Sequence, residues 1–512
     1  MLYKSPLPCL PFIQQNKMQF FLFPLLLAMA HTTAAVELVQ SNQLRRVLTR
    51  TALREHGQKF MDFAFQSPGT QKNRVFGSIG HNLTVEYIKQ KLDETGYYDT
   101  EYQSFQALFS QGNAYFVWGG DGFFETGWFT YGPAGSVAGD IVPVNEVGCT
   151  LADYPAAVEG NIALIKRGNC EFGLKVAYAG AAGAKGAVIY NNAPGPIAGG
   201  TLNYPSRPEG PYVPVGSISL EDGEFLLSLP YVAQGSLTVE ATTEIRTTRN
   251  ILATTKGGDK NNVVFAGAHT DSVSEGPGLN DNGSGAIGLL EIALKLTKWS
   301  VNNAVKFGWW SAEEFGLLGS NYYVEQLSPE GLGELALYLN ADMIASPNFG
   351  YFVYDGDGSA FNITGPPGST QIEKLFEEYF KEVGLPTEPT AFDGRSDYGP
   401  FLDAGVPCGG LFTGAEGKKT AAQVALWGGK AGISYDENYH QYGDTLENTN
   451  TGAWIQNTKA LAHAIATYAR NLTGIPRTAQ RNGATVFGDC FHQKALKHVI
   501  FENMAAFGRI LN

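Results

Sequence analysis

Five side chains of the types that bind divalent metals lie where predicted core elements of the 512-residue chain end. The set comprises two imidazoles and three carboxylates: His269, Asp281, Glu314, Asp342 and His440. Five such ligands can hold two zinc ions about 3.5–4 Å apart, provided that one carboxylate bridges them. Glu313, directly before Glu314, is a spare carboxylate that could act as a base. These residue types point to hydrolysis at a two-metal centre.

Three apolar segments are predicted to be buried strands, and each runs up to one of these polar side chains. VVFAGA precedes His269, AVKFGWWS runs up to Glu313, and LALYLNA precedes Asp342. Helix-like segments lie between them, notably GAIGLLEIALKLTKW and GLLGSNYYVEQL. Strands that alternate with helices predict a largely parallel sheet, whose functional residues collect at the carboxyl ends of the strands.

Each ligand taken alone has a simpler explanation. A single His after a strand is more often a hydrogen-bonded loop residue, Asp281 suits a helix N-cap, and Glu313 with Glu314 suits a solvated loop. The placement of all of them at element ends reverses that balance. Asp271, two residues after His269, could also orient the free ring nitrogen of a metal-bound imidazole.

Five motifs make the chain resemble the secreted dizinc aminopeptidases, a family that includes aminopeptidase Y and the fungal secreted leucine aminopeptidases. They are HTDS, LNDNGSG, SAEEFGLLGS, LNADMI and YHQYGDT, and the resemblance runs from about residue 58 to about residue 472. It implies the zinc exopeptidase fold, an α/β fold with a mostly parallel mixed sheet flanked by helices. It also implies that Asp281 bridges two zinc ions. His269 and Asp342 would complete one site, and Glu314 and His440 the other.

The resemblance also assigns roles to the neighbouring residues. Glu313 would be the general base that takes a proton from the bridging water, and Asp271 would be the outer partner of His269. Tyr439 would stabilise the oxyanion. Arg395, in GRSDYGPF, would lie near the substrate backbone, and Met343 beside the pocket for the substrate side chain.

The loop that carries His440 departs from the family pattern. Many relatives flank the Tyr-His segment with two cysteines, and the corresponding positions here are Asn438 and Gly443. Packing and hydrogen bonds alone must then hold the loop. We expect activity to survive this change.

A second domain is predicted within the peptidase sequence, at about 125–235. ALIKRG reads as a strand, FGLKVAYAGAAGA as a helix and GAVIYNN as a second strand. The segment resembles the mainly-β protease-associated domain inserted in this family. It carries no ligand cluster, so it either shapes substrate access or is a passive insert. The expected division of the chain is 1–35 signal peptide, 36–124 propeptide and first part of the catalytic domain, 125–235 inserted domain, 236–475 catalytic domain and 476–512 C-terminal extension.

The N-terminus reads as a signal peptide, because the apolar run QFFLFPLLLAMA after Lys17 is too short to span a membrane. Met18 could be the true start. Secretion, with the vacuole as the alternative location, would allow disulfide bonds. We favour a bridge between Cys149 and Cys170, since both fall in the inserted domain, and leave Cys408 and Cys490 open. Three sequons could carry glycans, at Asn82, Asn362 and Asn471, whereas a glycan on Asn282 would obstruct the metal site.

Composition fits a soluble globular enzyme, with 44% hydrophobic and 17% charged residues. A net charge of −13 argues against nucleic acid and anionic membranes as partners. The function that we expect is a monomeric aminopeptidase that acts on peptides with a free N-terminus and prefers apolar residues such as leucine. A dizinc carboxypeptidase, a receptor without zinc ligands and a one-zinc glutaminyl cyclase are the alternatives. The complete ligand set argues against the receptor and the glutaminyl cyclase. The short segment after the last motif argues against the carboxypeptidase, whose relatives have a further helical domain.

Overall fold

The computed structural model describes residues 36–69, 72–120, 122–197 and 200–477. The predicted signal segment with Met18, the end of the chain with Cys490, and nearly all of the predicted C-terminal extension therefore lie outside the described residues. Among the described residues, no helix has both the length and the apolar character needed to cross a bilayer.

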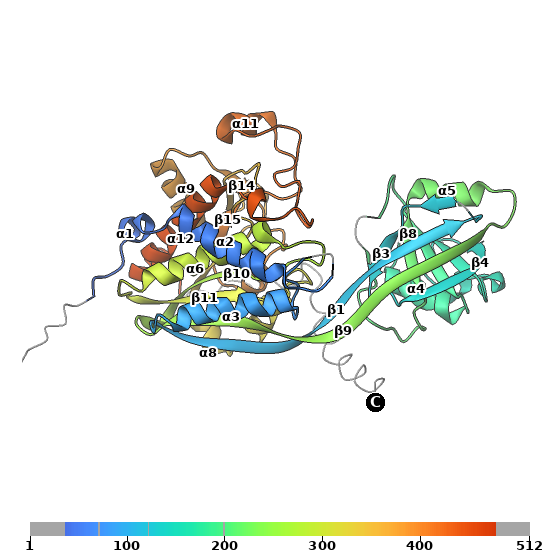
Figure 1. The fold of residues 1–512 in the computed structure, drawn as a ribbon, viewed down its shortest axis with the longest axis horizontal. Helices are drawn as coiled ribbons and strands as arrows, with labels where there is room; N and C mark the ends of the chain where they lie inside the picture. Colours follow the sequence, from blue (N-terminus) through green and yellow to red (C-terminus); the bar gives the residue numbers. More distant parts are fainter. Residues whose placement is uncertain (1–35, 70–71, 121, 198–199, 478–512) are drawn as a thin grey trace, which may run out of the picture. The chain divides into compact units, whose positions relative to one another are not determined.

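The peptidase part is built on one mixed sheet with strand order β14-β13-β15-β12-β10-β11-β9, and β1 pairs with β9 (Figure 1). Strands β10, β11, β12 and β15 run parallel to their neighbours within this set, whereas β9 is antiparallel to β11 and β13 to β15. The strand bounds are β9 Gln234–Thr255, β10 Asp259–His269, β11 Asn303–Trp310, β12 Leu335–Ala341, β13 Phe352–Tyr354, β14 Glu388–Thr390 and β15 Cys408–Phe412. The predicted α/β fold with a mostly parallel mixed sheet is confirmed.

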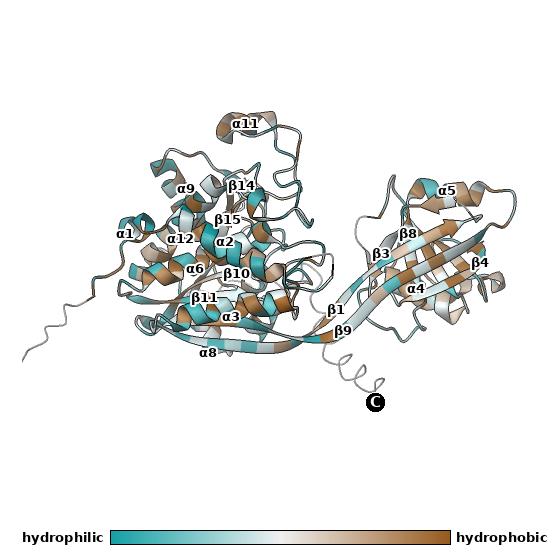
Figure 2. Ribbon diagram, in the orientation of Figure 1, coloured by the Kyte–Doolittle hydropathy of each residue, from teal (hydrophilic) through white to brown (hydrophobic). Residues whose placement is uncertain are grey.

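Both faces of this sheet are covered, which explains why its central strands are apolar without interruption. Successive residues of β10 point to opposite faces, so that Val264 joins one core cluster and Phe265 another. The first cluster is covered by the following helices: α1 Ser41–Arg46, α2 Arg50–Ala64, α3 Ile79–Asp93, α6 Gly285–Leu296, α9 Ser369–Glu382 and α12 Thr451–Arg470. The second is covered by α7 Leu318–Glu325, α8 Pro329–Glu334 and α10 Tyr398–Asp403. Figure 2 shows α2 and α3 carrying both hydrophilic and hydrophobic residues, as expected of helices with one buried face.

Local sequence sets where these helices begin. Ser78 caps α3 by accepting the backbone N–H of His81, and Asn450 caps α12 by accepting the N–H groups of Gly452 and Ala453. The helices α1 and α2, from the region in which a propeptide was expected, contribute buried side chains such as Leu53 and Phe60 to the core. Residues 38–64 thus belong to the folded peptidase.

The inserted part lies between two long antiparallel strands, β1 Tyr98–Trp118 and β9, which pair without a register shift from Tyr98↔Thr255 to Trp118↔Gly235. Its other elements are β2 Gly122–Phe124, β3 Gly127–Thr130, β4 Gly135–Pro143, β5 Ile162–Lys166, α4 Phe172–Ala181, β6 Gly186–Tyr190, β7 Gly200–Thr201, β8 Val215–Ile218 and α5 Leu220–Ser228. The predicted strand–helix–strand unit is present as β5, α4 and β6, and the two strands pair in parallel.

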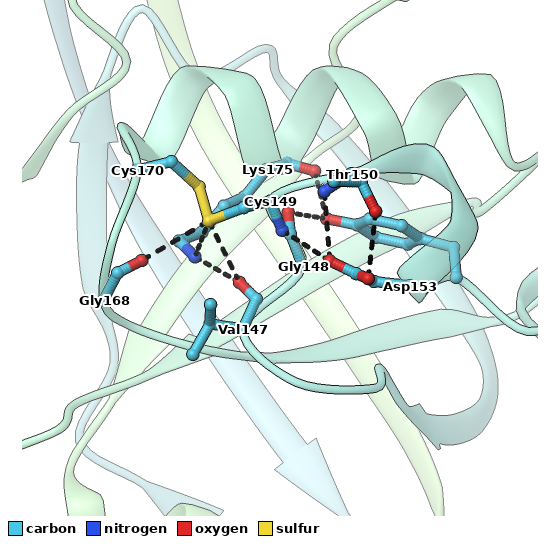
Figure 3. Close-up of a disulfide and its surroundings, with 9 residues drawn as sticks. Val147, Gly148, Cys149, Thr150, Asp153, Gly168, Cys170 and Lys175 are labelled. Atoms are coloured by element: carbon cyan, nitrogen blue, oxygen red, sulfur yellow. Dashed lines mark hydrogen bonds between the residues drawn. A yellow bond between two sulfur atoms is a disulfide. The ribbon is translucent and has the colours of Figure 1, made fainter.

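A disulfide joins Cys149 to Cys170 within this part, which is the pairing favoured from sequence (Figure 3). Their Cα atoms are 5.9 Å apart, within the ordinary range for a bridge. The backbone N–H of Cys149 also donates to Asp153 at 2.8 Å. The bridge therefore fixes the loop before α4 to the loop after β4.

Candidate metal centre and substrate cleft

The register of the central strands brings three of the predicted ligand positions to one edge of the sheet. His269 is the last residue of β10 and lies opposite Trp310 at the end of β11, while Gly267 lies opposite Asn340 of β12. Because parallel strands end at the same edge, the residues that follow β11 and β12 meet His269 there. These residues are Glu313, Glu314 and Asp342.

Asp281 lies between two groups of ligands. Its Oδ1 is 3.3 Å from Nε2 of His269, and that nitrogen is 3.5 Å from Asp342. Its Oδ2 is 3.1 Å from Nε2 of His440, which is 3.0 Å from Glu314. One carboxylate thus faces a separate ligand set with each of its oxygens. Glu313 approaches Nε2 of His269 at 3.8 Å, farther than Asp281 or Asp342 does.

Several of these buried ligand atoms have no hydrogen-bond partner among the described residues, namely Oε1 of Glu314, Oδ1 of Asp342 and Nε2 of His440. The His440 nitrogen is close to two carboxylates but has hydrogen-bond geometry with neither. Buried polar atoms in proteins are normally satisfied, so converging unsatisfied atoms are what a metal site requires. A third acidic group, Asp355, Asp357 and Glu373, is different, because backbone N–H groups donate to all three of its carboxylates.

The charges of the cluster also favour a cation. Burial alone would lower the pKa of His440, but Glu314 and Asp281 outweigh it and raise this pKa to about 11. Burial together with the Asp281 charge raises the pKa of Glu314 to about 7. The two imidazoles and Glu314 therefore bind protons more tightly than they would in water, and a divalent metal would compete for the same position.

A buried network that the sequence did not reveal positions Asp281. Asp444 accepts the backbone N–H groups of Asn280 at 2.7 Å and of Asp281 at 3.0 Å. Asn282, whose peptide bond with Asp281 is cis, donates to the carbonyl of Ala341 at 2.8 Å. Asp444 lies in the YHQYGDT motif, but only the fold places it beneath a residue 163 positions earlier in the chain.

The loop between His269 and Asp281 is held by Arg74, which is fully buried. Its guanidinium donates to three backbone carbonyls, those of Thr270, Pro277 and Gly278. A basic residue far upstream of the motifs therefore fixes the chain between two ligands, and no local pattern marks it.

Asp271 lies beside His269 with both its backbone carbonyl and its carboxylate. Nδ1 of His269 lies 3.2 Å from the backbone carbonyl of Asp271 and 3.7 Å from its carboxylate. The Asp271 carboxylate accepts the backbone N–H of Glu313 at 3.1 Å. The carbonyl orients the imidazole, and the carboxylate positions the residue predicted to be the base. Asp342 has an outer partner that the sequence did not indicate, since Ser396 donates to its Oδ2 at 2.6 Å.

Tyr439 and Arg395 lie together at the rim of the site. Nη2 of Arg395 donates to the Tyr439 phenol at 3.2 Å, and Nη1 donates to Glu416 at 2.8 Å. Burial and the nearby Asp281 raise the pKa of Tyr439, so its phenol keeps its proton. The Tyr439 ring also stacks on that of His440, with centroids 3.8 Å apart.

A cleft opens in front of these groups. Met343 lines this cleft, and its other apolar lining residues were not predicted: Tyr354, Ala391, Tyr398, Phe412 and Ala415. The predicted ligands Asp281, Glu314 and Asp342 also line it, together with Glu313. The cleft therefore joins an apolar chamber to the carboxylates of the centre.

Two residues of the site have backbone dihedrals in the left-handed region, Met343 with φ 45° and His440 with φ 57°. Such conformations cost about 1–3 kcal/mol each and persist where the surroundings over-determine them. The Met343 carbonyl accepts the backbone N–H of Thr413 at 2.9 Å, and its own N–H donates to Asn282 at 3.2 Å.

The His440 loop is held by amide and carboxylate groups. Asn438 donates to Asn448 at 2.7 Å, Asn448 donates to Asp436 at 2.8 Å, and Asp436 accepts from Asn280 at 2.7 Å. The network runs from the His440 loop to the residue before Asp281. Hydrogen bonds thus take the place where relatives were expected to have two cysteines.

Comparison with known proteins identifies the class. The profile of Peptidase family M28 matches residues 250–465, and that of the PA domain matches residues 137–226. Leucine aminopeptidase 2 of Arthroderma otae is 49% identical over 443 residues, covering 86% of this chain and 88% of its own length. The probable leucine aminopeptidase 2 of Aspergillus oryzae is 51% identical over 427 residues, covering 83% of this chain and 85% of its own length.

Solved structures agree with this assignment. An aminopeptidase from Aneurinibacillus sp. strain AM-1 superposes with a TM-score of 0.65 at 28% identity, covering 84% of this chain and 96% of that one. BSAP, a zinc aminopeptidase from Bacillus subtilis, shares the fold with a TM-score of 0.57 at 23% identity, covering 81% and 93%. The fold and site are those of a metallo-aminopeptidase. The chain belongs to peptidase family M28 and carries an inserted PA domain.

Proposed function

We propose that this protein is a secreted dizinc aminopeptidase that removes apolar N-terminal residues, leucine among them. The observation that carries the proposal is the two-sided environment of Asp281, each of whose oxygens faces its own imidazole and carboxylate. His269, Asp281 and Asp342 would hold one zinc ion, and Asp281, Glu314 and His440 the other. The unsatisfied buried ligand atoms support this division. Zinc as the metal is supported by the family and by BSAP, which is a zinc aminopeptidase.

When bound, zinc lowers the pKa of a coordinated water toward about 7 and polarises the substrate carbonyl. Glu313 would accept the proton of the attacking water and return it to the leaving amine. Its backbone N–H is fixed by Asp271, which supports a positioned base. Tyr439, a protonated phenol, would donate a hydrogen bond to the oxyanion, and Arg395 keeps that phenol in place.

The cleft supports the preference for apolar N-terminal residues. Met343, Tyr354 and Phe412 give it apolar walls, and burial of a leucine side chain is worth about 1.5–3 kcal/mol. The carboxylates that line the cleft would attract the free α-amino group of a peptide. The names of the fungal relatives support leucine as one such residue. We propose peptides with a free N-terminus as substrates of the monomer.

The remaining predictions stand as proposals. We retain the domain division drawn from sequence, with the inserted domain at 125–235, and the extracellular location. Of the proposed glycan sites, Asn362 and Asn471 are exposed, and Asn82 is half-buried near the start of α3. Asn282 is fully buried, and its side-chain nitrogen donates to the Ala341 carbonyl, which argues against a glycan there.

The test compares leucine-4-nitroanilide with its N-acetyl derivative as substrates of the purified protein. We expect cleavage of the free amine only, loss of activity with a chelator, and recovery with zinc. Metal analysis should give two zinc ions for each chain. One ion at full activity would contradict the dizinc assignment, and hydrolysis of the acetylated substrate would contradict an exopeptidase that requires a free amine.

A further inference from the structure

Arg395 is the one basic side chain among the described residues that line the cleft, where the carboxylates include Asp393 as well as those of the metal centre. A cation at this place could bind the α-carboxylate of a short substrate. The Tyr439 phenol is 3.2 Å from the guanidinium. If Tyr439 faces the reacting carbonyl, Arg395 lies beside the residue that follows the cleaved bond.

Glu416 removes that attraction. Its carboxylate accepts from Nη1 of Arg395 at 2.8 Å, so that both arms of the guanidinium are occupied, one by a carboxylate and one by the phenol. Burial alone would raise the pKa of Glu416, but the hydrogen bond from Arg395 holds it below its ordinary value, so the carboxylate is ionised. The pair carries no net charge.

Substrate length decides what this neutral pair meets. In a dipeptide, the α-carboxylate is three bonds from the reacting carbonyl carbon, next to Arg395. In a longer peptide, a neutral amide occupies the same place. An arginine without a carboxylate partner would favour the dipeptide over longer peptides. An arginine paired with Glu416 does not favour the dipeptide.

We propose that Glu416 is a specificity-determining residue that neutralises Arg395 and so directs the enzyme toward peptides of three or more residues. The inference rests on the proposed aminopeptidase function. Neither Glu416 nor Arg395 is needed for the fold, because their side chains are 57% and 56% exposed and surface ion pairs of this kind contribute little to stability. A substitution at Glu416 therefore tests charge rather than folding.

The experiment measures kcat/KM of the zinc-loaded enzyme for Leu-Gly and for Leu-Gly-amide, which differ only in the negative charge. We expect Glu416→Gln to raise the ratio of Leu-Gly to Leu-Gly-amide about fivefold, and this gain to shrink between 0.05 and 0.5 M salt, because a half-exposed charge pair is worth about 1 kcal/mol and is screened. Glu437→Gln is the matched control. It removes one exposed carboxylate from the His440 loop, outside the cleft lining, and should leave the ratio within about twofold.

The effect must also depend on Arg395. In an Arg395→Gln background, Glu416→Gln should leave the ratio unchanged. An unchanged ratio in Glu416→Gln, an equal change in Glu437→Gln, or an equal loss on both substrates would overturn the specificity role. Failure of the wild-type enzyme on both substrates would overturn the proposed function, and this inference with it.

Discussion

Two adjacent carboxylates, Glu313 and Glu314, face different partners. Oε2 of Glu314 is 3.0 Å from Nε2 of His440, whereas Glu313 is 3.8 Å from His269 and its N–H is anchored by Asp271. Left-handed backbone at Ala312, the residue before Glu313, and at Leu317 brackets the turn that carries both carboxylates. This difference supports the proposal that Glu314 is a ligand and Glu313 the base.

Glu313→Gln is expected to lower kcat for leucine-4-nitroanilide about 10²–10⁴-fold, because an amide cannot accept the proton, while zinc content stays unchanged. Steady-state kinetics and metal analysis of the same preparation check this. Loss of an ion from the variant would make Glu313 a ligand instead of the base.

Tyr439→Phe removes the donor proposed for the oxyanion and is expected to lower kcat about 10²-fold with a small change in KM. Tyr442→Phe is the control, since it deletes an exposed phenol from the same loop. Similar kinetics for the two variants would exclude Tyr439 from transition-state binding.

The parts of the site that the sequence predicts are those that local pattern determines. The strands before His269, Glu313 and Asp342 end where their apolar runs end. The partners that position the ligands escape prediction, because Asp444, Arg74 and Ser396 reach the site only through tertiary structure. Asp271 was predicted as the outer partner of His269, and the turn after β10 places its carbonyl 3.2 Å and its carboxylate 3.7 Å from Nδ1 of that imidazole.

At the scale of elements, the loop between α11 (Ala421–Trp427) and α12 is ordered by polar contacts that could be replaced by a covalent one. A Cβ atom at Gly443 would lie 3.4 Å from that of Asn438, close to the distance found in disulfides. The two positions are therefore near enough for a bridge to form with a small shift of the loop.

The double variant Asn438→Cys/Gly443→Cys is therefore expected to form a bridge under oxidising conditions. Closing this short loop should raise the free energy of unfolding by about 2 kcal/mol. Loss of the Asn438 hydrogen bond should offset about 1 kcal/mol of that increase. Thermal unfolding of the oxidised and reduced forms, with thiol titration, measures the net effect. Free thiols after oxidation would show that the loop moves more than this geometry implies. Activity should be retained in the oxidised form.

At the scale of the whole molecule, the buried His81 and the half-buried His56 and His463 make stability depend on pH. Burial is the main cause that lowers the pKa of His56, His81 and His463 to about 4, compared with about 6.5 for an ordinary histidine. The unfolded chain binds more protons between these values. The contribution of these three histidines to the free energy of unfolding should therefore be fully present above pH 6.5 and be lost as the pH is lowered toward 4.

Urea unfolding of chelator-treated protein at pH 7 and pH 5 tests this, with His81→Gln as the reference. His81 is fully buried and should account for a loss of about 2 kcal/mol at pH 5, so the variant should lose less stability by about that amount. Equal losses in the two proteins would mean that His81 is protonated in the folded state.

The unbroken pairing of β1 with β9 makes the PA domain a removable cassette. Gln111 lies opposite Thr242, so the chain leaves and re-enters the peptidase across a single rung of one ladder. Joining these residues through Asn-Gly would close an ordinary hairpin and keep Phe105 and Phe109 in their core cluster. We expect the shortened enzyme to cleave leucine-4-nitroanilide within about tenfold of the wild-type rate. An insoluble product would show that the peptidase depends on the cassette for folding. If only the cleavage of protein-sized substrates changes, the PA domain selects substrates by size. Such selection could then be acquired or lost through a change in the length of one turn.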